Sequence, residues 1–125
     1  MIASFRDLYL WQRAMALIRT VYPIADNLPD CERYGLTPQL RRAVTSFALN
    51  IAEGKQRSTR KECARFIDIA LGSLNEVEAI LLIIQELYSP SDTTAETAFA
   101  DLTVLRKMLY SLRSKLRVPA PPPSP

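Results

Sequence analysis

Apolar residues recur at alternating steps of four and three along the chain between Arg60 and Tyr88. This spacing places them on one side of an α-helix, so it predicts a helix over residues 60–88. Residues 79–84 are apolar all the way round, which exceeds what one buried side requires. We therefore expect the most buried helix of a bundle, with one face left for another subunit. Its predicted buried side is Cys63, Ile67, Ala70, Leu74, Val77, Leu81, Ile84 and Tyr88.

The same spacing of apolar residues predicts a first helix from about Arg6 to Asp26, followed by a loop over residues 27–34. Pro23 falls inside this helix and favours a kink or an early end, because proline cannot donate an α-helical hydrogen bond. The predicted buried side is Leu8, Trp11, Met15, Ile18, Tyr22 and Ala25.

A second helix is predicted to begin with Thr37 as its N-cap and Pro38 at the first helical position. Gly54 would close this helix in a left-handed conformation. Ala43 and Ala48 flank the predicted buried side and permit close packing. That side consists of Leu40, Val44, Phe47 and Ile51.

Residues 55–59 form the predicted connection to the third helix. Thr59 followed by Glu62 is a capping box, with Ser58 as the alternative cap. Gly72 lies in the middle of the third helix and costs about 1 kcal/mol relative to alanine. We expect the close approach of a neighbouring helix to offset this cost.

A fourth helix is predicted over about residues 93–117, after a break at residues 89–92. Four amphipathic helices with short connections predict an all-α, antiparallel up-down-up-down four-helix bundle over residues 1–117. The proline-rich residues 118–125 predict a polyproline or disordered tail, with a ligand for another domain as the alternative. The buried side of the fourth helix is Ala95, Phe99, Leu102, Leu105, Leu109, Leu112 and Leu116.

Composition supports one domain with one core, since the 125 residues are 48% hydrophobic. No apolar run approaches the roughly 20 residues of a membrane span, and the N-terminus lacks the pattern of a signal peptide. We therefore expect no membrane contact and a cytoplasmic location. Cys31 and Cys63 would lie at opposite ends of the second helix, too far apart for a disulfide, so free thiols are predicted.

Charge is unevenly placed, although the formal net charge is only +3. In the predicted topology, the start of the first helix, the connection at residues 55–59 and the end of the fourth helix share one end of the bundle. Twelve basic and four acidic residues would gather there, Arg13 and Arg106 among the basic ones. This pattern favours binding of a polyanion, RNA or DNA. The residues predicted to bind it are Lys55, Arg57, Arg60, Lys61, Arg65, Arg113, Lys115 and Arg117.

The alternative interpretation of these cations is structural. Basic residues in the last turn of the fourth helix interact favourably with its dipole, and solvated cations need no partner. No aromatic-rich surface accompanies them, so stacking on bases is not predicted. Any binding should be sensitive to salt and weakly sequence-specific.

The sequence predicts no catalytic residue, metal site or cofactor. It contains no histidine, and its three glycines stand too far apart for a phosphate loop. Asn50 shares a helix face with Glu53, and Ser73 shares one with Glu76. We expect Asn50, Glu53 and Glu76 to satisfy helix ends or to pair with the nearby arginines.

Several blocks of residues occur in a characteristic order and spacing. They are Phe5-Arg6-Asp7-Leu8, Trp11-Gln12, Tyr34-Gly35-Leu36-Thr37, Asn50-Ile51-Ala52-Glu53-Gly54 and Gly72-Ser73-Leu74 with Glu76. Over about residues 5–88 the chain resembles the four-helix-bundle family of rRNA intervening-sequence proteins. The structural signature of that family corresponds here to Asn50, Glu53, Gly54, Gly72 and Glu76.

The resemblance implies a left-handed antiparallel bundle that assembles as a ring-shaped homopentamer. Some relatives are encoded inside intervening sequences of large-subunit rRNA genes. A related branch serves as the accessory protein of diversity-generating retroelements and contacts a reverse transcriptase and nucleic acid. The expected partners are therefore copies of the chain itself, RNA or DNA, and a reverse transcriptase. A protein-interaction scaffold or accessory subunit with no direct nucleic-acid role is the alternative function.

Overall fold

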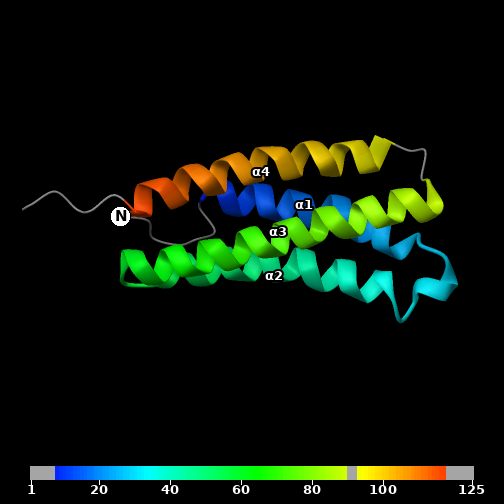
Figure 1. Ribbon diagram of the computed structural model, residues 1–125, viewed down its shortest axis with the longest axis horizontal. Coiled ribbons are helices and arrows are strands. Elements are labelled where there is room, and N and C mark those ends of the chain that lie inside the picture. Colours follow the sequence, from blue (N-terminus) through cyan, green and yellow to red (C-terminus); the bar gives the residue numbers. More distant parts are fainter. Residues whose placement is uncertain (1–7, 90–92, 118–125) are drawn as a thin grey trace, which may run out of the picture.

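In the computed structural model, which describes residues 8–89 and 93–117, four α-helices pack into a bundle (Figure 1). The helices are α1 (Tyr9–Asp26), α2 (Leu36–Gln56), α3 (Arg60–Tyr88) and α4 (Thr93–Arg117), and a short 3-10 helix, η2 (Asp30–Glu32), follows α1. Each α-helix contacts the next one in sequence, and α1 also contacts α4, so the four enclose a shared core. The predicted all-α four-helix bundle is confirmed.

Two ion pairs show how α3 and α4 lie against each other. Asp68, near the start of α3, pairs with Arg113, whereas Glu78, farther along α3, pairs with Arg106. The partners occur in opposite order on the two helices, so α3 and α4 run antiparallel. The complete up-down-up-down order and the left-handed twist stay predictions, and the predicted tail lies outside the described residues.

Most of the residues predicted to be buried in α2, α3 and α4 are buried, which confirms the prediction for these positions. All four residues predicted for the buried side of α2 are fully buried, and the two alanines beside them are buried as well. On α3, every predicted residue is buried except Tyr88, which is half-buried. On α4, Phe99, Leu112 and Leu116 are half-buried against the core, and Ala98 occupies a fully buried position instead.

The predicted buried side of α1 is wrong except at Ala25, which is buried as predicted. Both stripes of α1 are apolar, so the periodicity alone does not choose between them. The structure turns the smaller residues toward the core and leaves Trp11 and Tyr22 half-buried at its edge. Bulky rings at the edge cover the core without having to fit inside it. The residues that face the core are Leu10, Ala14, Leu17, Val21 and Ala25.

The start of α1 differs from the prediction, whereas its end at Asp26 agrees with it. The helix begins at Tyr9 with Leu8 as its N-cap, and Arg6 lies outside the described residues. Pro23 does not end the helix early, since α1 continues to Asp26. At this position proline removes one hydrogen bond near the end of the helix, and the Pro23 carbonyl still accepts one from the Asn27 N–H at 3.0 Å.

Thr37 does not cap α2, which begins at Leu36. The Leu36 N–H donates instead to the Glu32 carboxylate at 3.1 Å, so η2 supplies a side chain that satisfies the start of α2. The Thr37 hydroxyl donates to the Ala25 carbonyl at 3.2 Å and ties α2 to α1. Pro38 becomes the third helical residue, where its missing N–H is still without cost.

The predictions for the two helical glycines are both wrong. Gly54 does not close α2, which continues to Gln56, and its φ is not positive. It is buried, and a Cβ atom there would lie 3.1 Å from the Phe66 Cβ. Gly72 faces open space, with nothing within 4 Å of an added Cβ. The close helix approach expected at Gly72 therefore occurs at Gly54, between α2 and α3.

Cys31 and Cys63 are not joined, as predicted, and only Cys31 is exposed. Over residues 8–89 and 93–117, the helices are too short or too polar to cross a membrane.

Candidate nucleic-acid interface

The connection between α2 and α3 lies at the same end of the bundle as the last turn of α4 (Figure 1). Leu116 of α4 lines a hollow together with Gly54 and Arg57, which confirms that these distant segments meet. All eight predicted binding residues belong to segments that meet there. We call this set the basic end: Lys55, Arg57, Arg60, Lys61, Arg65, Arg113, Lys115 and Arg117.

The start of α3 adds to the positive potential of the basic end. Thr59 is the N-cap, as predicted, and its hydroxyl oxygen accepts a hydrogen bond from the Glu62 N–H at 3.1 Å. The remaining backbone N–H groups of the first turn point out of the helix without an intrahelical partner. Together with the helix dipole, they favour an anion beside the first turn.

Arg57 and Arg113 of the basic end are held by carboxylates. Arg57 pairs with Glu53 one turn before it, and Arg113 pairs with Asp68, with a second contact of 3.3 Å. The pairing of Glu53 with an arginine was predicted. Glu62 is the third acidic residue that the structure describes in this region, so the eight cations of the basic end outnumber the described carboxylates, which are three. The basic residues that lack a carboxylate partner among the described residues are Lys55, Lys61, Arg65, Lys115 and Arg117.

The Phe66 ring contacts the guanidinium groups of two of these arginines, Arg57 and Arg65. The guanidinium of Arg57 lies 4.6 Å from the centre of the Phe66 ring, and that of Arg65 lies 4.9 Å from it. Cation–π attraction at these distances restrains both side chains. Sequence reasoning missed this role of Phe66, although an aromatic residue off the buried side in the most basic stretch of the chain was a usable signal.

Arg13 and Arg106 do not belong to the basic end. The prediction that they gather there with the other basic residues is therefore wrong. Arg13 pairs with Asp101 on α4 at 3.5 Å. Arg106 pairs with Glu78 on α3 at 3.2 Å and also donates to Asn75. Each of these arginines forms an ion pair that joins two neighbouring helices along the side of the bundle.

A groove of about 880 Å³ runs between the first two turns of α3 and the end of α4. A smaller hollow of about 340 Å³ lies below the α2–α3 connection, and Arg60 and Leu116 line both spaces. The basic end is therefore concave as well as cationic. The groove is lined by Arg60, Lys61, Glu62, Ala64, Arg65, Asp68, Leu116 and Arg117.

Cys63 lines the smaller hollow but is not a reactive thiol. Burial raises the pKa of Cys63, and the nearby Lys55 ammonium only partly opposes this effect. The thiol therefore stays protonated at neutral pH, whereas the thiolate is the nucleophilic form.

Asn50, a polar residue of the family signature, belongs to a hydrogen-bond network with Ser46 and Ser73. Asn50 donates to the Ser46 carbonyl at 2.8 Å and to its hydroxyl at 3.2 Å, and the Ser46 and Ser73 hydroxyls lie 3.0 Å apart. This network joins α2 to α3. Glu76 is exposed and takes no part in it. In the described part of the chain neither Asn50 nor Glu76 satisfies a helix end or pairs with an arginine, so that prediction is wrong for both residues.

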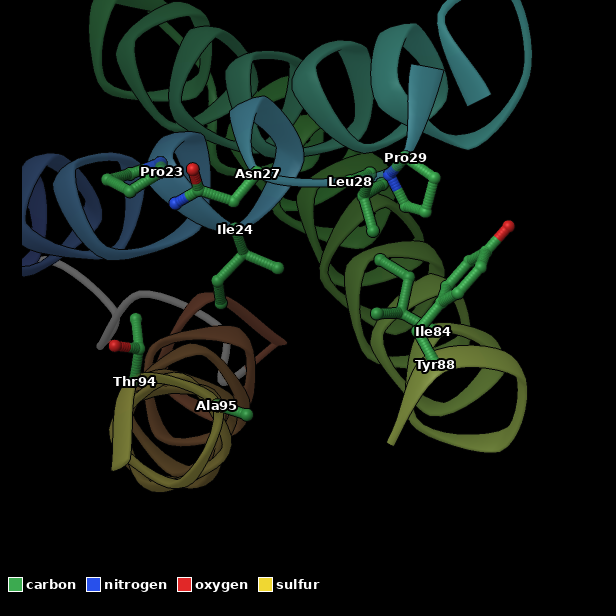
Figure 2. Close-up of a pocket in the computed structure, with 9 residues that line it drawn as sticks. All are labelled: Pro23, Ile24, Asn27, Leu28, Pro29, Ile84, Tyr88, Thr94 and Ala95. Atoms are coloured by element: carbon green, nitrogen blue, oxygen red, sulfur yellow. The ribbon is translucent and has the colours of Figure 1, made fainter. Parts of the chain in front are cut away.

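A different cavity, of about 360 Å³, lies at the opposite end of the bundle (Figure 2). Figure 2 shows side chains of α1, α3, α4 and the connection after α1 around it, among them Ile24, Leu28 and Ile84. Among the residues that the structure describes, no charged side chain lines this cavity. It therefore offers nothing to a polyanion.

Comparison with known proteins agrees with this architecture. The profile of the 23S rRNA-intervening sequence protein family matches residues 6–111. The fold is similar to the crystal structure of a protein of unknown function from the S23 ribosomal protein family of Bacteroides thetaiotaomicron. The TM-score is 0.75 at 21% identity, over 83% of this chain and 97% of that one. A comparison with curated proteins gave no match. Because the family match spans most of the chain, this protein belongs to the 23S rRNA-intervening sequence protein family.

Proposed function

We propose that this protein is a non-enzymatic, oligomeric bundle that binds RNA or DNA through its basic end. One observation carries the proposal: cations from α2, α3 and α4, far apart in sequence, meet around one concave surface. A phosphate backbone is the polyanion that such a surface fits. Binding would release counterions and would weaken steeply as the salt concentration rises.

The oligomeric part of the proposal rests on α3. Apolar side chains that the bundle leaves 42–59% exposed lie on its outer side. Exposed apolar surface of this kind, rimmed by polar residues, is typical of protein–protein contacts. Several copies in a ring, the homopentamer that the resemblance implies, would present several basic ends and strengthen binding collectively. The residues are Ile69, Leu82, Ile83 and Leu87.

Charge reversal at the start of α3 tests nucleic-acid binding. The double variant Arg60→Glu, Lys61→Glu should remain folded, since carboxylates are favourable in the first turn of a helix. It should lose retention of labelled RNA and DNA in a gel-shift assay at physiological salt. The matched control is Arg19→Glu, Arg42→Glu, which makes the same charge change at exposed sites outside the basic end.

The control variant should retain nucleic acid and keep a similar dependence of affinity on salt. Unchanged retention by the Arg60 and Lys61 double variant would show that this surface does not bind nucleic acid. Equal loss in both variants would show that only the overall charge matters, and it would also contradict a localised site.

The second candidate function is an accessory subunit or scaffold for another protein, such as a reverse transcriptase. The exposed apolar residues of α3 favour this candidate, because they suit a protein partner as well as a second copy. The basic end would then guide docking without touching nucleic acid. A partner that stays bound in a pull-down after nuclease treatment would support this function.

A further inference from the structure

The groove at the basic end differs from a plain cationic surface because it has an apolar floor. Ala64 and Leu116, which contribute that floor, are half-buried. Arg60, Lys61 and Arg117 stand around it. The volume of about 880 Å³ falls within the roughly 300–1,000 Å³ of small-molecule sites, but charged side chains predominate in this lining, with Ala64 and Leu116 as its apolar part.

The carboxylates in the groove do not cancel its charge. Asp68 lines the groove but is bound by Arg113. Glu62 is the other acidic residue of the lining, and it faces a lining with four basic residues. An anion therefore meets a net positive groove.

The shape of the groove discriminates between forms of nucleic acid. The phosphates of a duplex lie on the outside of a cylinder, and its bases are stacked and paired, so that an apolar protein surface cannot stack on them. An unpaired nucleotide combines a flat, largely apolar base with an anionic phosphate. Such a unit matches an apolar floor with cations around it.

Arg65 supplies a further element of this match. Its guanidinium is restrained 4.9 Å from the centre of the Phe66 ring, and the same residue lines the groove. Unpaired bases stack on guanidinium planes as well as on aromatic rings. A restrained plane loses less conformational entropy on binding than a freely rotating side chain.

We propose that this groove takes an unpaired nucleotide, so that the basic end binds single-stranded RNA or DNA in preference to duplex. The base lies over Ala64 and Leu116 against the Arg65 guanidinium, and the phosphates lie on Arg60, Lys61 and Arg117. This inference rests on the proposed function and specifies the form of nucleic acid that the surface selects.

Fluorescence anisotropy with the full chain tests the inference. The probe is one labelled oligonucleotide, presented as a single strand and as the duplex with its complement, at physiological salt. The single strand should bind at least about fivefold more tightly, the lower limit of what one stacked base contributes. Arg65→Lys keeps the charge but removes the plane, so it should weaken single-strand binding about fivefold and leave duplex binding unchanged.

Two further variants complete the design. Arg42→Lys makes the same substitution at an exposed arginine at the other end of α2 and should change neither affinity. Ala64→Gln covers the floor with an uncharged chain and should also weaken single-strand binding selectively. Circular dichroism establishes that each variant is folded.

The possible results separate this inference from the proposed function. Equal binding of single strand and duplex, with Arg65→Lys indistinguishable from Arg42→Lys, would overturn the inference and leave the basic end as a nucleic-acid surface. Binding of neither probe would overturn the proposed function and this inference with it. A polyglutamate peptide that competes as well as the single strand would also overturn the inference, since the groove would then recognise charge alone.

Discussion

Gly54 and Gly72 have the same intrinsic cost in a helix, but their surroundings differ. Gly54 lies where α2 meets α3, and a Cβ atom there would make a tight contact of 3.1 Å with the Phe66 Cβ. Gly72 lies on the open side of α3. Sequence reasoning assigned the close approach to the wrong glycine, because the neighbour that decides the matter comes from another helix.

This difference predicts opposite effects of the same substitution. Gly72→Ala should raise the free energy of unfolding by about 1 kcal/mol, since alanine favours the helix and meets no atom. Gly54→Ala should lower it by about 1 kcal/mol, because the new methyl group presses on the Phe66 Cβ. Urea unfolding followed by circular dichroism measures both. A loss of stability in Gly72→Ala would contradict the open environment of that residue.

Tyr88 and Glu32 form a polar contact with a consequence for acid stability. The Tyr88 hydroxyl donates to the Glu32 carboxylate, and the Leu36 N–H donates to it as well. These hydrogen bonds lower the pKa of Glu32 from its ordinary value of 4.5, with that of Tyr88 contributing most. The stabilisation is therefore present above about pH 4.5 and is lost as the pH falls through the lowered pKa.

Tyr88→Phe removes the hydrogen bond that contributes most to the lowered pKa of Glu32. The variant should be less stable than the parent at neutral pH, and the difference should shrink at an acidic pH below the lowered pKa of Glu32, where that carboxyl is protonated. Urea unfolding at the two pH values measures this. Tyr110→Phe is the control, since Tyr110 is an exposed tyrosine without a hydrogen bond to another described residue. A difference for Tyr88→Phe that is independent of pH would contradict the role of Glu32.

At the scale of the helices, local signals were reliable where the chain itself contains the deciding group. The extents of α3 and α4 follow from apolar periodicity, and Thr59 caps α3 because both partners of the cap lie within four residues. The start of α2 was mispredicted because its N–H partner, Glu32, comes from η2. The buried side of α1 was mispredicted because two adjacent apolar stripes fit the same period.

The Thr59 cap gives a prediction for α3. Thr59→Ala should lower the free energy of unfolding by about 1 kcal/mol, since the Glu62 N–H loses its acceptor. Thr59→Ser keeps a hydroxyl oxygen in place and should stay close to the parent. Thermal unfolding of the two variants distinguishes them. Equal destabilisation by alanine and serine would show that the threonine methyl group, and not the cap, carries the effect.

At the scale of the whole molecule, the sequence located most of the candidate site but not its internal order. The topology brought the α2–α3 connection to the end of α4 as expected. The stacking of Arg57 and Arg65 on Phe66 was not foreseen, because it depends on side-chain directions. The prediction placed Arg106 at the basic end for a related reason: the sequence does not show that its partner, Glu78, lies beside it on another helix.

The outer side of α3 gives a prediction about assembly. If several copies meet there, as proposed, Ile83→Glu should reduce the molar mass measured by light scattering, because it places a charge in the contact. Val104→Glu makes the same change at an exposed apolar residue of α4 and should leave the mass unchanged. A parent protein that is already a single chain in solution would contradict the proposed oligomer.

Because Cys31 is exposed and Cys63 is buried, the protein can be labelled at a single cysteine. Cys31 is accessible and lies beside Tyr88, with its sulfur 3.7 Å from the hydroxyl, at the pole away from the basic end. Cys63 is buried. A maleimide reagent should therefore attach biotin at Cys31 alone, without mutagenesis. Protein immobilised in this way would face a sensor flow cell with its cationic pole outward, in one defined orientation.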